Sequence, residues 1–121
     1  MTSSPPLGPD AVTRPPRTVA VIGAGSIGIA WAMVLASAGL RARMYEMDPA
    51  TRVSAPDDIE LMLAELADAG LMDEPVSTVM SRIAMFDSLA EAVAGADFVQ
   101  ECVVEDLQVK RDLFAELDRL T

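Results

Sequence analysis

Residues 18–46 read TVAVIGAGSIGIAWAMVLASAGLRARMYE, and this stretch decides the fold. Its first five residues are apolar and rich in β-branched side chains, which is typical of a strand covered on both faces. Residues 27–38 continue without a helix breaker up to Gly39, which indicates a helix with a glycine C-cap. Residues 41–46 then alternate polar and apolar side chains, as a short second strand does. The order predicts a β-α-β unit with parallel strands.

A glycine-rich motif with the spacing G-x-G-x-x-G connects this first strand to the helix. It consists of Gly23, Ala24, Gly25, Ser26, Ile27 and Gly28. In a dinucleotide-binding turn the first glycine permits a tight turn, the second leaves room for a pyrophosphate, and the third lets the helix lie close to the strand. The helix start adds free N–H groups and the positive end of its dipole. We therefore predict that these six residues bind a dinucleotide.

The adenosine ribose has a candidate partner in Glu46, eighteen residues after Gly28 at the end of the second strand. A carboxylate about twenty residues beyond the motif accepts hydrogen bonds from the ribose and repels a 2′-phosphate. The sequence thus predicts NAD as the cofactor rather than NADP. Asp48 is the alternative ribose partner, although a proline follows it and turn formation explains it. Arg41 and Arg43 are interpreted as a solvated edge.

The remaining sequence continues the alternation of strands and helices. After a loop over 51–56 we expect a helix over 57–69, a turn at 73–75, a short strand over 82–86, a helical turn over 88–94, a buried strand over 97–103 and a helix over 105–120. This predicts an α/β fold, a Rossmann-type doubly wound parallel sheet that stops before its later strands. Five of the eight prolines lie within residues 1–17. We expect a disordered leader there, followed by an incomplete NAD-binding domain over residues 18–121.

Composition excludes several function classes. The net charge of −10 and the scatter of the nine basic residues argue against nucleic acid as a partner. No apolar run is long enough for a membrane span, and residues 1–17 lack the apolar core of a secretory signal, so we expect a cytoplasmic protein. The single cysteine, Cys102, is expected to be a small buried side chain. The chain has no histidine, so any catalysis must do without imidazole, and we predict no metal site.

Two strings resemble the NAD-binding domain of the 3-hydroxyacyl-CoA dehydrogenase family. They are VAVIGAGSIGIAWA at residues 19–32 and ADFVQECVVEDLQVKRDLFAELDRL at residues 96–120. The second string is similar to a run in the branch that contains lambda-crystallin and L-gulonate 3-dehydrogenase. The resemblance implies that Glu105 and Lys110 lie beside the cofactor, after the fourth strand. From the residues alone, both also fit an ordinary helix start, with the acid near the positive dipole and the lysine in solvent.

The resemblance further implies an oxidoreductase that oxidises a 3-hydroxy group to a ketone with NAD and that forms a homodimer. The family's catalytic histidine, glutamate, serine and asparagine, and its helical second domain, have no counterpart in these 121 residues. We therefore expect no catalytic residue here and substrate binding only in a longer enzyme. Five acidic residues and no lysine over 57–69 would oppose a CoA phosphate, so a small hydroxy acid is an alternative to a hydroxyacyl-CoA substrate. The alternative functions are a stand-alone NAD-binding or sensing module and a flavin or sugar-nucleotide domain.

Overall fold

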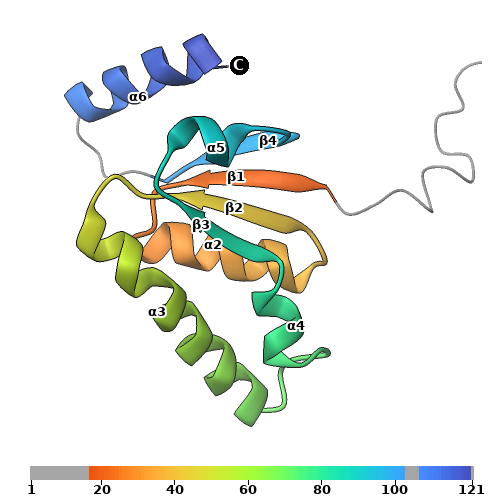
Figure 1. Ribbon diagram of the computed structural model, residues 1–121. Coiled ribbons are helices and arrows are strands. Elements are labelled where there is room, and N and C mark those ends of the chain that lie inside the picture. The colour runs from red at the N-terminus through yellow and green to blue at the C-terminus, as the bar shows by residue number, and fades with distance from the viewer. Residues whose placement is uncertain (1–16, 103–106, 121) are drawn as a thin grey trace, which may run out of the picture.

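Four parallel strands form the centre of the fold in the computed structural model, which describes residues 17–102 and 107–120, and side chains of the second range only from residue 111 onward. The strands are β1 (Thr18–Ile22), β2 (Arg41–Tyr45), β3 (Ile83–Phe86) and β4 (Phe98–Glu101), in the spatial order β3-β2-β1-β4. The chain moves outward from β1 to β3 and then returns to the other side of β1 (Figure 1). In open sheets, ligands bind at the carboxyl ends of the strands where the order reverses. The predicted Rossmann-type α/β sheet is confirmed.

Helices cover both faces of this sheet (Figure 1). On one face lie α2 (Ser26–Ser37), α3 (Pro49–Asp68) and α4 (Val76–Met80). On the other lie α5 (Leu89–Val93) and α6 (Leu107–Leu120). None of the helices in the described ranges has the length and apolar character needed to cross a bilayer. The predicted leader, apart from Arg17, lies outside the described residues.

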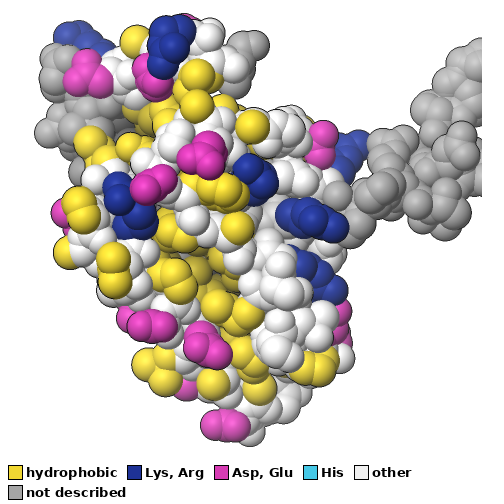
Figure 2. Space-filling model, viewed as in Figure 1, with side chains coloured by type: hydrophobic (Ala, Val, Ile, Leu, Met, Phe, Trp, Pro, Cys, Tyr) yellow, Lys and Arg dark blue, Asp and Glu magenta, His cyan; other side chains and the backbone are white. Residues whose placement is uncertain are grey.

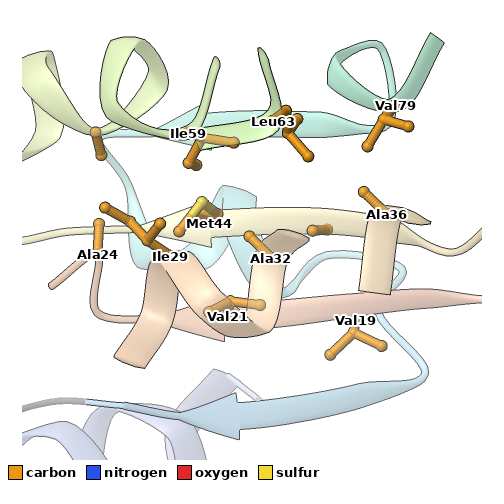
Figure 3. Packing of buried hydrophobic residues seen from close by; sticks show 12 residues of the cluster. Val19, Val21, Ala24, Ile29, Ala32, Ala36, Met44, Ile59, Leu63 and Val79 are labelled. Atoms are coloured by element: carbon orange, nitrogen blue, oxygen red, sulfur yellow. The ribbon is translucent and has the colours of Figure 1, made fainter. Parts of the chain in front are cut away.

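Strand β1 joins the two layers of the core, because it has a strand on each side and helices above and below. Alternation along the strand sends Val19 and Val21 into the layer beneath α2 and α3, and Ala20 and Ile22 into the layer beneath α5 and α6. All four side chains are at most 5% exposed. Figure 3 shows the first layer, where side chains from β1 and β2 meet those of α2 and α3. The carboxyl end of β1 is therefore a rigid base for the turn that follows it.

Helix α3 begins at Pro49, so the predicted loop over residues 51–56 is wrong. The carboxylate of Asp48 caps the helix by accepting hydrogen bonds from the Thr51 N–H at 3.0 Å and the Thr51 hydroxyl at 2.6 Å. Proline is favoured at the first helical position, where an N–H would have no partner. Pro56 lies inside the helix. The helix continues through it, and Ala55, Ile59 and Leu63 are buried in the core cluster.

Strand β4 is shorter and more exposed than predicted. The sequence predicted a buried strand over 97–103, whereas β4 ends at Glu101, with Phe98 53% and Val99 38% exposed. Among the described residues β4 pairs only with β1, so it is an edge strand with one open side. Cys102, expected to be buried, is half-buried against the core, and this burial raises the pKa of its thiol.

The short helix α4 was not predicted, because five residues contain too little periodicity to be recognised. It follows Pro75 and buries Val79 against the core. Just after it, the Arg82 guanidinium donates to both carboxylate oxygens of Glu74, at 2.7 and 2.6 Å. It also donates to the carbonyl of Ala36 at 2.9 Å. Arg82 therefore fastens the α4 segment to the end of α2.

Helix α6 covers the second face with two of the four predicted apolar residues, Leu117 and Leu120, and with Leu113. The predicted apolar positions were Leu107, Phe114, Leu117 and Leu120. The structure buries Leu113 and Leu117 and leaves Phe114 about half exposed, while the side chain of Leu107 is not described. Leu113 was missed although it lies one helical turn before Leu117.

Candidate functional site

The glycine turn connects β1 to α2 at the carboxyl end of the sheet. Gly23 has a φ of 107°, a conformation that glycine adopts without strain. Its N–H donates to the carbonyl of Tyr45 at 2.7 Å, which joins the turn to the end of β2. A Cβ atom on Gly28 would lie 1.8 Å from the Gly23 carbonyl oxygen. The backbone thus requires glycine at both positions, because helix and turn are in direct contact.

The amino end of α2 is open in front of Gly25. Gly25 is the N-cap residue, and no described side chain caps the helix. The N–H groups of Ser26, Ile27 and Gly28 have no acceptor within the helix, as in the first turn of any α-helix. A Cβ on Gly25 would meet no described heavy atom within 4 Å, and the Ile27 side chain is exposed. Free donors and the positive end of the helix dipole therefore face open space, an arrangement that suits an anion.

Glu46 follows β2 directly, and its half-buried side chain bridges two loops. Its Oε1 accepts a hydrogen bond from the Ala24 N–H at 2.7 Å, and its Oε2 accepts one from the Asp48 N–H at 2.9 Å. The carboxylate therefore links the glycine turn to the β2–α3 loop. A carboxylate offers about four acceptor positions, two on each oxygen. One position on each oxygen is used by these backbone contacts, and the other is available to a ligand.

Arg52, which the sequence analysis did not single out, supports the loop that carries Glu46. Its Nε donates to the carbonyl of Glu46 at 2.8 Å and its guanidinium to that of Met47 at 3.3 Å. Asp48, the alternative ribose partner, uses its carboxylate to cap α3. Hydrogen bonds from Thr51 hold the pKa of Asp48 below its ordinary value. A D-P-x-T pattern is a helix-start signal, and recognising it would have placed Arg52 in the first turn of α3.

A cavity of about 330 Å³ lies beside Gly23 and Glu46, between the carboxyl ends of β1 and β2 and the helices α5 and α6. Its remaining lining is apolar except for two acids of α6: Ile22, Tyr45, Met47, Leu89, Leu113, Asp112 and Glu116. Apolar walls with a few polar groups are typical of small-molecule sites. The cavity therefore extends the site from the glycine turn towards the second layer of helices.

Two of the predicted site residues cannot be placed against the others. Glu105 lies outside the described residues, and for Lys110 the structure describes only the backbone, within the first turns of α6. Their position beside the cofactor stays a prediction. Residues 23–28 and Glu46, in contrast, lie together and are joined by hydrogen bonds. No group of three potential metal ligands occurs in the part of the chain that the structure describes.

Arg43 is not part of a solvated edge, as the sequence had suggested. Its guanidinium donates to the carbonyl of Ala92 at 3.1 Å and to that of Glu91 at 2.6 Å. It also lies over the ring of Phe86, 4.2 Å from the centroid. The interpretation failed because β2 is an interior strand and α5 lies over this part of it. Arg41, at the start of the same strand, is exposed as expected.

Comparison with known proteins identifies relatives of this site and fold. The family model described as 3-hydroxyacyl-CoA dehydrogenase, NAD binding domain, matches residues 18–121. The lambda-crystallin homolog of Bos taurus is 40% identical over 107 residues, which cover 87% of this chain and 33% of that protein. The L-carnitine dehydrogenase of Nocardiopsis dassonvillei is 36% identical over 121 residues, which cover 100% of this chain and 35% of that protein.

Solved structures agree with these relatives. The 3-hydroxybutyryl-CoA dehydrogenase of Escherichia coli superposes with a TM-score of 0.78 at 32% identity, covering 86% of this chain and 22% of that one. A diketoreductase superposes with a TM-score of 0.79 at 31% identity, covering 87% and 38%. The chain spans about a third of the length of the curated relatives given above. The comparisons therefore confirm the resemblance seen in the sequence.

Proposed function

Because the chain belongs to the 3-hydroxyacyl-CoA dehydrogenase family, whose NAD-binding domain it matches, we propose that residues 23–28 and Glu46 hold the ADP half of NAD. One observation carries this proposal. The Glu46 carboxylate is hydrogen-bonded to the N–H of Ala24, within the glycine turn itself. The groups suited to the pyrophosphate and to the ribose therefore form one connected unit before any ligand binds.

The pyrophosphate fits in front of Gly25. The space there is open, and the free N–H groups at the start of α2 face it. A side chain at Gly25 would fill this space without disturbing any described neighbour. Packing therefore does not require a glycine here, which supports the proposal that the glycine leaves room for a ligand.

The ribose fits at Glu46. The open acceptor position on each carboxylate oxygen matches the two adjacent hydroxyls of an adenosine ribose. The N–H groups of Ala24 and Asp48 hold the carboxylate, so moving it aside for a 2′-phosphate would break two hydrogen bonds. A 2′-phosphate would also be repelled by the negative charge. We therefore expect this domain to prefer NAD over NADP.

The neighbouring cavity of about 330 Å³ suits the adenine ring. It adjoins both Gly23 and Glu46, and Met47 and Leu89 contribute to its apolar walls. A flat base can enter a mostly apolar cavity without removing water from many polar groups of the protein, so its binding there costs little desolvation free energy. In this proposal the ADP half of the coenzyme lies along the carboxyl edge of β1 and β2.

The chemistry of the whole enzyme follows as part of the same proposal. Bound NAD supplies a hydride acceptor. We infer that a protein with this domain and a complete catalytic domain oxidises a 3-hydroxy group to a ketone, with Glu105 and Lys110 beside the cofactor. A small hydroxy acid suits it better than a CoA thioester, because the acidic side chains of α3 between residues 57 and 68 are exposed. The homodimer and the cytoplasmic location implied by the resemblance stay predictions.

Calorimetric titration of the 121-residue chain with NAD and with ADP-ribose tests the coenzyme site. We expect the two ligands to bind with similar affinity, because the proposed contacts are all to the ADP half. The variant Gly25→Val should bind neither ligand, because its branched side chain occupies the space proposed for the pyrophosphate. Its fold should be retained. Thermal unfolding without ligand checks the fold.

The variant Ala69→Val is the matched control, because it introduces the same valine side chain at an exposed position that follows α3. It should bind both ligands as the parent does. If the folded Gly25→Val chain binds NAD as tightly as the parent, the glycine turn is not the pyrophosphate site and the proposal fails.

A further inference from the structure

A second cavity lies at the opposite end of the sheet, where the strands begin. It has a volume of about 550 Å³. Its lining comes from the starts of β1, β2 and β3, from the ends of α2 and α4, and from the loop after α5: Thr18, Gly39, Arg41, Ala42, Arg43, Ser81, Arg82, Ala84, Ala94 and Gly95. Figure 2 shows basic side chains gathered over this end of the molecule, at the right of the view. The proposed coenzyme site is at the other end of the same strands.

The lining carries a net positive charge. Three of its residues are arginines, and none is acidic. Glu74 neutralises Arg82 through the paired hydrogen bonds described above. Arg43 donates from Nε and one Nη to two carbonyl groups, which are neutral and leave its charge uncompensated. Arg41 and Arg43 therefore carry two positive charges that no acidic residue of the lining offsets, in a chain whose net charge is −10. A described carboxylate beside the lining is that of Asp97, which accepts a hydrogen bond from the Thr18 N–H at 2.9 Å.

Three of the nine basic residues meet at this cavity, although they are spread along the sequence. Arg41 and Arg43 are separated by one residue along β2, so both side chains lie on the α5 face of the sheet. Arg82 precedes β3, and its carbonyl accepts a hydrogen bond from the Ala42 N–H at 2.9 Å. Parallel pairing of β2 and β3 thus brings together arginines that are about forty residues apart in the sequence.

Packing accounts for two of the three arginines. Arg43 connects β2 to α5, and Arg82 connects α4 to α2. Arg41 is exposed and makes no hydrogen bond or ion pair with any described residue. Its guanidinium therefore has five N–H donors available at the mouth of a positively charged cavity.

We propose that this cavity binds a small phosphate-bearing anion, such as a pyrophosphate or a phosphate monoester, with Arg41 as its main ligand. A guanidinium matches the oxygens of a phosphate with two parallel hydrogen bonds, and such charge-assisted bonds are strong. The chain's overall negative charge opposes a long polyanion, so a compact ligand is favoured over a nucleic acid. The lining glycines Gly39 and Gly95 have open space where a Cβ would stand, which leaves room for the ligand.

Calorimetric titration with inorganic pyrophosphate tests the proposal, at about 0.15 M salt so that distant charges are screened. The experiment uses the Gly25→Val background, because the glycine turn would also accept pyrophosphate. We expect one binding site to remain in Gly25→Val. Adding Arg41→Ala should weaken it about tenfold or more, as expected when a hydrogen-bonded charge is removed. Backbone amide shifts of Gly39 and Gly95 should move on titration, and those of residues 23–28 should not.

Arg111→Ala is the matched control, because it removes the same charge from an exposed position on α6, outside the lining. It should change the affinity by less than about twofold, as a screened distant charge does. Equal weakening by Arg111→Ala and Arg41→Ala would overturn the proposal, since it would mean unspecific attraction. Loss of all pyrophosphate binding in Gly25→Val alone would overturn it too, while leaving the proposed coenzyme site intact. If the parent chain does not bind NAD, only the proposed coenzyme site is refuted.

Discussion

The substitution Gly28→Ala should strongly lower the free energy of unfolding of the domain, although it adds only one methyl group. The added Cβ would lie 1.8 Å from the Gly23 carbonyl oxygen and 2.7 Å from its carbon. Both atoms belong to the backbone, and β1 is held by strands on each side, so neither can move without disturbing the sheet. Overpacking in a tight core costs about 1–3 kcal/mol, and contact with fixed backbone should reach about 3 kcal/mol.

Urea unfolding followed by circular dichroism measures this cost. A domain of this size has an m-value of about 1–1.5 kcal/mol per M urea, so the midpoint should fall by about 2–3 M. The melting temperature should fall by more than about 10 °C. The slope should be unchanged, because the unfolded state exposes the same surface.

Gly25→Ala is the matched control within the same turn. Its Cβ meets no described atom within 4 Å, and its φ of −75° is open to any residue. Its free energy of unfolding should stay within about 0.5 kcal/mol of the parent's, while its affinity for NAD falls. A stable Gly28→Ala chain, or equal destabilisation by both variants, would refute the assignment of packing to Gly28 and ligand space to Gly25.

Three further variants test the neighbouring loop. Glu46→Gln should weaken the binding of NAD by about 1–3 kcal/mol and reduce the preference for NAD over NADP, because the amide NH₂ group of glutamine would face a backbone N–H that now donates to a carboxylate oxygen. Calorimetric titration measures both affinities, with Glu60→Gln as the control. Arg52→Lys should lower the affinity for NAD severalfold and shift the Ala24 amide resonance, because one ammonium group replaces a guanidinium that donates to two carbonyls. An unchanged Ala24 resonance would show that Arg52 does not position Glu46. The hydrogen-bonded carboxylate of Asp48 has a folded-state pKa below its ordinary value of 3.8, so its contribution to stability is present above that pH and is lost as the pH falls through the folded pKa. The urea midpoint of the parent should therefore exceed that of Asp48→Asn at about pH 6 and approach it at about pH 3, and a constant difference would contradict the assignment.

Sequence reasoning succeeded where a local pattern has one physical solution. The run of residues 18–22 is apolar on both faces, so it had to be a central strand, and Gly23 to Gly28 marked the turn that follows. The strand and helix order then determined the topology, because parallel strands joined by helices permit few arrangements. Glu46 was selected by its spacing from Gly28, and its role at the ribose stays a prediction. The hydrogen bond from the Ala24 N–H to its carboxylate was not predictable from sequence.

The errors occurred where distant contacts override local signals. Pro56 suggested a loop, yet α3 passes through it, with Ala55 and Ile59 buried in the core. Phe98 and Val99 suggested a buried strand, yet β4 is at the edge of the described sheet. Arg43 was read as a solvated residue, because its partners in α5 are almost fifty residues away. In each case the surroundings of the residue are decided by elements remote in sequence, so no local window contains the information.

The two ends of the sheet suit ligands by different physical means. At the carboxyl end, helix N–H groups provide the positive potential, so the Glu46 carboxylate beside Ala24 is compatible with the phosphate site proposed at the glycine turn. At the amino end, carbonyl-rich helix ends provide no such donors, so an anion requires formal charge, and arginines line the cavity. This difference predicts different responses to salt. Phosphate binding at the arginine-lined cavity should weaken steeply as salt screens the charges, whereas the affinity for NAD should fall less, because the proposed site also contacts the ribose and the adenine. Parallel titrations with pyrophosphate and NAD at low and high salt would contradict this reasoning if both affinities fell equally.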